Sequence, residues 1–91
     1  EALVKSLASP HSGVRYWCAQ IAGTFPDPVL TEPLYRLLDD ANADIRVAAI
    51  TALDMIAPAD LKDRLKAALS READEYVRDF YIQVLEEGEP E

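Results

Sequence analysis

The side chains that most often perform chemistry are few and scattered in this sequence. His11 and Cys18 are the only histidine and the only cysteine. A lone cysteine allows neither an internal disulfide nor a multi-cysteine zinc site, so we expect Cys18 to be a small buried hydrophobe, and we expect His11, in a polar turn, to be solvated or to cap a helix. The acids Asp39, Asp40 and Asp44 form a small cluster that a solvated turn explains more simply than a cation site. With no nucleophile–base pair, His–Glu metal site or glycine-rich phosphate loop in the sequence, we predict a protein that is not an enzyme and that needs no cofactor or metal.

The chain is strongly acidic overall, and its negative charge increases toward the C-terminal end. Seventeen Asp and Glu against nine Lys and Arg give the 91 residues a net charge of −8. Residues 1–31 sum to zero, residues 32–62 to −3 and residues 63–91 to −5. Nucleic acids and anionic membranes are bound by clustered basic residues, so this balance argues against both as partners. No apolar run is long enough for a membrane span and no signal segment opens the chain, so we expect a cytoplasmic protein.

These residues must be positioned by short amphipathic helices, and residues 34–57 contain one complete unit of two. Leucines recur at helical spacing in its first half, and apolar residues recur in the same way in its second half. The two stripes are Leu34, Leu37 and Leu38, and Ile45, Ala48, Ala49, Ala52, Leu53 and Ile56. One hairpin cannot bury both stripes alone, so neighbouring units are needed.

The neighbouring units appear when the sequence is shifted by about 31 residues. The shift aligns Leu3 with Leu34 and Leu65, and Leu7 with Leu38 and Leu69. The third turn carries one extra residue, which a loop absorbs easily. We therefore predict an all-α fold of three helical hairpins, with repeats at about 1–26, 27–57 and 58–88, stacked as a right-handed α-solenoid. We expect residues 88–91 to be a frayed acidic tail after a helix stop at Gly88, and the whole sequence to be a fragment of a longer chain, since it starts part-way into a helix.

The second helix of the first repeat is predicted over residues 14–24, after a break over residues 9–13. Its apolar stripe is expected to face the core, and it comprises Val14, Trp17, Cys18, Ile21 and Ala22, continued by Phe25. Trp17 is accordingly predicted to be a core residue. At the other end, Tyr76, Phe80 and Tyr81 are expected to seal the stack.

Helix starts are signalled by polar capping residues. Asn42 and Asp74 are predicted to cap the second helices of the second and third repeats. Asp27 could cap a turn with Pro28 in its first position, but we favour a helix that begins near Thr31, with Thr31 as its cap and residues 28–30 as a loose lead-in.

The run LLDDANADIRVAAITAL resembles the short HEAT-like repeat of the type found in phycobiliprotein lyases. That repeat has two leucines, an acid, a polar turn, Val-Arg, and then spaced alanines and a leucine. LASPHSGVRYWCAQIAG and LSREADEYVRDFYIQVL match the pattern less closely. The resemblance covers nearly the whole chain and implies an ARM-like α–α superhelix, but its motif residues are structural.

The resemblance also implies a structural ladder in which turn acids hydrogen-bond helix arginines of adjacent repeats. Asp40 and Arg46 match that pair, and Arg15 and Arg78 keep the basic positions. Ser9 and Arg71 stand where the other acids would be, so the ladder is complete only in the middle repeat unless Arg15 reaches forward to Asp40.

The candidate binding surface is what remains on the second helices after the hairpin core is assigned. An apolar strip through Tyr16, Val47 and Ile50, flanked by acids, would suit a basic peptide or protein with apolar anchors. The alternative is that Ile50 and Ile82 pack between adjacent repeats. The candidate partner-binding residues are Tyr16, Gln20, Val47, Ile50, Thr51, Asp54, Asp79 and Gln83.

We therefore expect a non-catalytic scaffold that binds a partner protein or peptide along the face of the second helices. A fragment or subunit of a bilin-binding phycobilin lyase is the alternative that the repeat type permits, and a structural spacer without a ligand is a third. Self-association through an exposed repeat end is also expected if no further repeat covers it.

Overall fold

Three helical hairpins stack in an open row. The computed structural model describes residues 2–87, and no strand occurs in that range. Its elements in chain order are α1 (Ala2–Ser6), α2 (Ser12–Thr24), the 3-10 turn η1 (Pro28–Leu30), α3 (Thr31–Leu37), α4 (Ala43–Ile56), α5 (Leu61–Leu69) and α6 (Glu75–Glu87). The predicted tail at 88–91 and the stop at Gly88 lie outside the described residues. The all-helical, hairpin-based fold class predicted from the spacing is confirmed.

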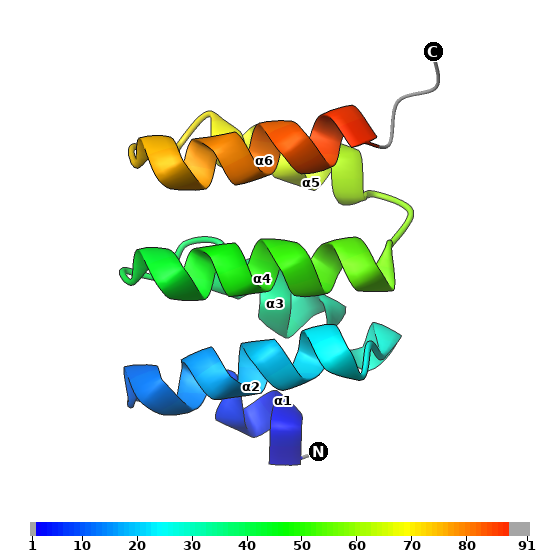
Figure 1. The fold of residues 1–91 in the computed structure, drawn as a ribbon. Helices are drawn as coiled ribbons and strands as arrows, with labels where there is room; N and C mark the ends of the chain where they lie inside the picture. The colour runs from blue at the N-terminus through cyan, green and yellow to red at the C-terminus, as the bar shows by residue number, and fades with distance from the viewer. Residues whose placement is uncertain (1, 88–91) are drawn as a thin grey trace.

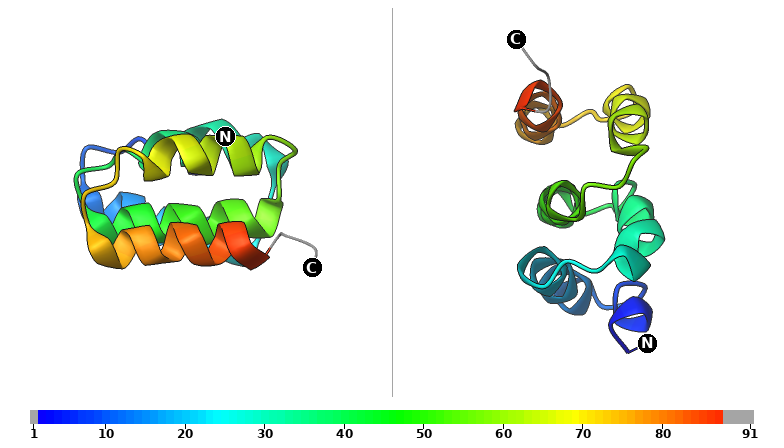
Figure 2. Two further views of the ribbon diagram at one scale, coloured as in Figure 1. Left: turned by 90° about the horizontal axis from the view of Figure 1, so that it is seen from above. Right: turned by 90° about the vertical axis from the view of Figure 1, so that its right-hand side faces the viewer.

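The hairpins form two layers. The second helices α2, α4 and α6 lie side by side in one layer, and α1, α3 and α5 lie behind them in the other (Figures 1 and 2). The middle helix α4 packs against both α2 and α6, and its own hairpin partner α3 covers its back. The row does not close on itself, so within residues 2–87 each end of the layer presents a helix edge with no second helix beyond it.

The core runs between the layers and along the row. The leucines that define the repeat occupy it, since Leu34 and Leu65 are fully buried and Leu7 and Leu38 nearly so. The largest fully buried side chains are Tyr81, Leu7, Leu30, Leu34, Ile45, Ile50, Leu53, Leu65 and Val77. Most of them come from the middle repeat or from residues that face it, because among the described hairpins the middle one has a neighbour on both sides.

Capping residues start the second helices as predicted in the second and third repeats. The Asn42 carboxamide oxygen accepts hydrogen bonds from the backbone N–H groups of Asp44 (2.8 Å) and Ile45 (3.3 Å). The Asp74 carboxylate accepts from Tyr76 (2.9 Å) and Val77 (3.3 Å) in the same way. Each cap satisfies backbone donors that have no partner inside the helix, which fixes where α4 and α6 begin.

The start of α3 differs from the prediction, in which Thr31 was the cap and residues 28–30 were a loose lead-in. The helix does begin at Thr31, but residues 28–30 form η1 and are no loose lead-in. Asp27 caps η1 by accepting from the Val29 N–H at 3.1 Å, and Pro28 occupies the first position of the turn. Proline is favoured there because its missing N–H would lack a partner anyway, so the turn and α3 follow each other without a break.

The apolar stripe of α2 also differs from the prediction. The helix begins at Ser12, so Gly13 belongs to it. Ala19 and Ala22 are buried, whereas Val14, Trp17, Ile21 and Phe25 are exposed, so Trp17 is not a core residue. The stripe faces away from α4, toward the open end of the row, where no described helix covers it. At the other end Tyr81 is buried as predicted, but Tyr76 is exposed and stacks edge-on against Phe80 with 5.2 Å between ring centroids.

A second set of contacts joins the first-helix layer between repeats. Tyr35 of α3 is nearly buried, and its hydroxyl donates a 2.8 Å hydrogen bond to the Asp60 carboxylate at the start of α5. The Arg64 guanidinium lies over the Tyr35 ring, 3.9 Å from its centroid. Burial, with the hydrogen bond to Asp60 as the next contribution, raises the pKa of the Tyr35 hydroxyl, so the phenol stays neutral and holds α3 against α5.

Candidate functional site

A shallow hollow lies on the surface of the second helices, between α2 and α4. Its volume is about 190 Å3. The residues that line it are Tyr16, Ala19, Gln20, Gly23, Asp44, Val47, Ala48, Thr51 and Tyr76, and together they are called the second-helix hollow. Small residues form its floor, because α2 and α4 approach each other through alanine and glycine: the α-carbon of Gly23 lies so near Ala52 that an added β-carbon would be in contact at 3.7 Å.

Four of the eight candidate binding residues come together in this hollow. Tyr16 and Gln20 line it from α2, and Val47 and Thr51 line it from α4. Tyr16 and Val47 are half-buried, so each offers an apolar surface that is held in place. The Thr51 hydroxyl donates to the backbone carbonyl of Val47 at 3.1 Å, which leaves its methyl group and the two lone pairs of its oxygen for a ligand.

The remaining candidates lie elsewhere. Ile50 is fully buried and therefore cannot contact a partner, which corrects the predicted strip and agrees with the alternative that it packs between repeats. Asp54, Asp79 and Gln83 are exposed but do not line the hollow. Ile82, which was expected to pack in the same way as Ile50, is exposed because no second helix lies beyond α6 in residues 2–87.

Five residues of the hollow were not among the predicted candidates: the small residues Ala19, Gly23 and Ala48, and the larger residues Asp44 and Tyr76. Asp44 and Tyr76 line it although they were assigned to a helix N-terminus and to the sealed end of the stack. They occupy corresponding positions in their repeats when the offset of 32 residues is used. That offset places both in the first turn of a second helix, and this could have shown that they share one edge of the surface.

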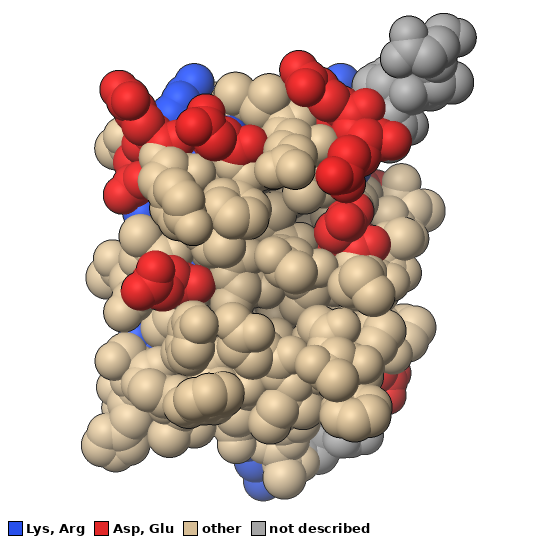
Figure 3. Space-filling model, in the orientation of Figure 1, with Lys and Arg blue, Asp and Glu red and all other residues tan. Residues whose placement is uncertain are grey.

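Acidic side chains surround the C-terminal half of the same face. Figure 3 shows Asp and Glu gathered over α6 and the adjacent part of α4, while the surface over α2 is nearly free of charge. The sequence has the same gradient, from zero net charge over residues 1–31 to −5 over residues 63–91. A ligand lying along the second helices would therefore meet apolar surface at one end and negative potential at the other.

The turns on one side of the stack are joined by the arginine ladder, which comprises Arg15, Arg46 and Arg78 with their oxygen acceptors. Arg15 does reach forward: its Nε and Nη2 donate to the two carboxylate oxygens of Asp40 at 2.7 and 3.3 Å. Its Nη1 donates to the carbonyl of Ser9 in its own turn at 2.8 Å. The guanidinium thus bonds one turn through a carbonyl and the next turn through a carboxylate.

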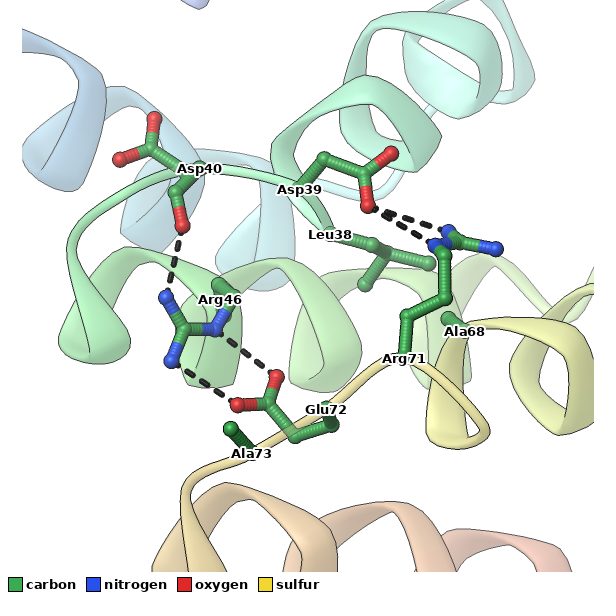
Figure 4. A pocket seen from close by; sticks show the side chains of 8 residues that line it. All are labelled: Leu38, Asp39, Asp40, Arg46, Ala68, Arg71, Glu72 and Ala73. Atoms are coloured by element: carbon green, nitrogen blue, oxygen red, sulfur yellow. Dashed lines mark hydrogen bonds and ion pairs between the residues drawn. The ribbon is translucent and has the colours of Figure 1, made fainter.

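Arg46 repeats this arrangement one hairpin further along (Figure 4). Its Nη1 donates to the backbone carbonyl of Asp40 at 2.7 Å, and its Nε and Nη2 donate to the Glu72 carboxylate at 2.8 and 2.9 Å. The Asp40 side chain is therefore the partner of Arg15, and Arg46 takes only its carbonyl. Arg78 donates to the carbonyls of Leu69 and Glu72 at 3.1 and 3.0 Å. Each ladder arginine thus bonds the carbonyl six residues before it.

Glu72 is the ladder residue that the sequence reasoning missed. Arg71 was placed at the position of the third turn acid, but Arg71 points outward and pairs with exposed Asp39 at 3.1 Å. Glu72 occupies the buried position, with only 8% of its surface exposed. The extra residue in the third turn shifts the alignment to 32, which matches Asp40 with Glu72, so the signal was present in the sequence.

Tyr81 lies behind this cluster with its hydroxyl buried. Within residues 2–87 that hydroxyl has no hydrogen-bond partner. Burial, assisted by the negative charge of Glu72, raises the pKa of Tyr81 to about 12. The phenol therefore stays neutral at physiological pH, and it contributes packing and no charge to the arginine ladder.

The residues that most often perform chemistry, His11 and Cys18, both belong to the first repeat. His11 stands at the N-cap position of α2, but its side chain makes no capping hydrogen bond, and Cys18 is a partly buried free thiol. Among residues 2–87, no group of three or more His, Cys, Asp and Glu is placed to hold a metal ion. None of the helices found there has the length and apolar character to cross a membrane.

Comparison with known proteins agrees with the hairpin architecture. Neither the curated proteins nor the solved structures gave a match. A family model described as HEAT repeats matches residues 1–86, which is nearly the whole chain. Repeats of this family generally mediate protein–protein interactions and typically serve as non-catalytic scaffolds. The chain therefore belongs to the HEAT repeat family.

Proposed function

We propose that this chain is an interaction scaffold that binds an extended, basic segment of a partner protein in the second-helix hollow. The observation that carries the proposal is the hollow itself, in which half-buried Tyr16 and Val47 stand beside the carboxylate of Asp44. An apolar side chain of the ligand would fit between Tyr16 and Val47. A Lys or Arg one or two residues away in the ligand would meet the carboxylate of Asp44. The acidic residues toward α6 would favour further basic residues along the ligand.

The size of the hollow limits what it can hold. At about 190 Å3 it accommodates one or two side chains and is smaller than the pockets that usually enclose a small-molecule ligand. Its open surface and rigid helical walls are suited to a peptide that lies across α2 and α4. Affinity would then come from one anchor and a set of charge interactions, so we expect moderate, salt-sensitive binding.

The test is a titration of the chain into fluorescein-labelled peptides, followed by fluorescence anisotropy. One peptide alternates lysine and leucine, a second of the same length alternates glutamate and leucine, and a third alternates lysine and serine. The proposal expects binding of the first, weaker binding of the third, and none of the second. Added salt should weaken the binding of the first, because attraction between opposite charges is screened.

Substitutions test whether the peptide binds at the second-helix hollow. Val47→Asp and Tyr16→Ser should each weaken binding of the lysine–leucine peptide by about tenfold, the usual effect of removing an anchor contact. Val29→Asp is the matched control, because it introduces the same change at an exposed valine that lies in η1, outside the hollow. For charge, Asp44→Asn is compared with Asp63→Asn in the first turn of α5. Equal affinities of the paired variants, or no binding of any peptide, would refute the proposal and favour a structural spacer.

A further inference from the structure

The outer edge of α2 is the largest group of apolar side chains that the fold leaves uncovered. Val14, Trp17, Ile21 and Phe25 all point there, and Trp17 and Phe25 are 66% and 71% exposed. The four residues, called the α2 edge, are spaced by three or four positions, so they form one continuous stripe. In Figure 1, α2 is the second helix at one end of the row. Gly23, which is not part of the stripe, lies on the side of α2 that approaches α4, beside Ala52.

The equivalent positions in the other two repeats show what this edge is shaped to contact. In α4, Ile45, Ala48 and Ala52 occupy the positions of Val14, Trp17 and Ile21, and all three are buried. In α6, Val77 occupies the first of these positions and is likewise buried. Both helices pack against the preceding second helix, and Ala52 of this edge lies beside Gly23 of α2. The α2 edge therefore has the register of a helix–helix contact surface, and its partner should be another helix with an apolar stripe.

A second copy could supply that helix from its α6 or from its own α2 edge. The charges on these two surfaces favour the α2 edge. The outer side of α6 carries Asp79 and Glu86 on either side of Ile82, and it belongs to the segment with a net charge of −5. Packing it against the α2 edge would leave these carboxylates beside apolar surface, at a cost in desolvation. Two α2 edges, by contrast, bring together the segments with zero net charge and keep the acidic ends apart. Figure 3 shows the same separation on the surface.

We propose that the chain forms a two-fold symmetric dimer in which the α2 edge packs against the α2 edge of a second copy. In such an interface Trp17 of each copy contacts the other copy close to the symmetry axis. Every residue acts twice, so each substitution changes the interface at two places. The two acidic ends, including α6, lie at the far ends of the dimer, and both second-helix hollows remain open to ligand.

The association is tested by sedimentation velocity and by the fluorescence of Trp17, the single tryptophan of the chain. With rising concentration the mass should increase from 10.1 kDa to twice that value, and the emission should shift to shorter wavelength as the indole leaves water. Added salt should strengthen association, because it screens the repulsion between two chains of charge −8. The salt response is opposite to that expected for binding of a basic peptide, so the two proposals are judged separately.

Substitutions test whether the α2 edge forms the dimer interface. Trp17→Ser and Phe25→Ser should each raise the dissociation constant of the dimer by at least about tenfold, since exposed aromatic anchors dominate such contacts. Met55→Ser is the matched control, because Met55 is a large apolar residue of similar exposure on α4 that lies outside the hollow, and the substitution should leave the mass unchanged. Far-UV circular dichroism checks that each variant folds. A chain that stays at 10.1 kDa up to about 1 mM, or a dimer that Trp17→Ser and Phe25→Ser leave intact, would overturn the proposal.

Discussion

Removal of the Glu72 carboxylate should destabilise the protein more than the loss of any exposed ion pair. Glu72 accepts two hydrogen bonds from Arg46 at 2.8 and 2.9 Å, and a third from the Asp74 N–H at 3.1 Å. The side chains of Arg46 and Glu72 are only 16% and 4% exposed. Glu72→Ala therefore leaves a largely buried guanidinium without its counter-charge and a backbone donor without its acceptor.

The loss of stability expected for Glu72→Ala depends on the contacts that Arg46 retains. Breaking a buried ion pair by removing one partner costs about 3–5 kcal/mol. Arg46 retains the bond to the Asp40 carbonyl at 2.7 Å and some access to water, so we expect the lower end of that range. A chain of 91 residues has a free energy of unfolding of roughly 5–14 kcal/mol. The substitution should consequently remove a large fraction of the stability while leaving every apolar contact of the core in place.

The assay is urea unfolding, with the free energy of unfolding compared between variants of similar slope. Asp39→Ala is the matched control, because the Asp39–Arg71 pair is exposed at both ends and such pairs contribute less than about 1 kcal/mol. The double variant Arg46→Met/Glu72→Met should cost less than Glu72→Ala, since it leaves no charge unpaired. If Glu72→Ala and Asp39→Ala had the same effect, the assignment of Glu72 as a buried link between repeats would be wrong.

Three further predictions concern two single residues, Tyr81 behind the arginine ladder and Gly23 between α2 and α4. Tyr81→Phe should raise the free energy of unfolding at neutral pH by about 1 kcal/mol, because it removes a buried hydroxyl that has no partner in the described structure, and a loss of stability in urea unfolding would show that the hydroxyl is bonded. The raised pKa makes the folded state bind the phenolic proton more tightly than the unfolded state, so the free energy of unfolding does not change with the titration of Tyr81 below pH 10.0 and falls as pH rises from 10.0 to about 12. Tyr81→Phe should lack that part of the alkaline destabilisation when unfolding is measured as a function of pH. Gly23→Ala should stabilise the protein by about 0.5–1 kcal/mol, since a β-carbon would meet Ala52 at 3.7 Å without a clash and alanine favours the helix; a lower melting temperature would mean that α2 and α4 lie closer than the structure shows.

The repeat architecture could be predicted because its signals are local and recur. Leu34, Leu65 and the capping residues Asn42 and Asp74 report a helix face or a helix start that depends on a few neighbouring residues. Each signal appears in more than one repeat, so the copies support one another. The fold class therefore followed from the spacing, and the structure confirms it.

The direction in which a stripe faces could not be predicted in the same way. Periodicity places Trp17 and Ile21 on one side of α2, but it does not say whether that side meets the hairpin partner, the preceding repeat or solvent. In α4 the equivalent residues are buried because α2 lies beside them, whereas α2 has no such neighbour in residues 2–87. Exposure at the end of a row is a property of the stack, and one helix carries no information about it.

The arginine ladder explains how repeats whose second helices meet partly through small side chains keep their register. Gly23 of α2 lies beside Ala52 of α4, with Ala19 and Ala22 of α2 also buried, and contacts between small residues restrain sliding only weakly because they interlock little. Arg15 and Arg46 each fix a turn to the next one by two directed bonds to a carboxylate, which tolerate only a narrow range of positions. Apolar burial thus supplies the attraction between repeats and the ladder sets their alignment. The second-helix hollow depends on both, because Tyr16 and Val47 stand on different helices and form one site only while α2 and α4 stay in register.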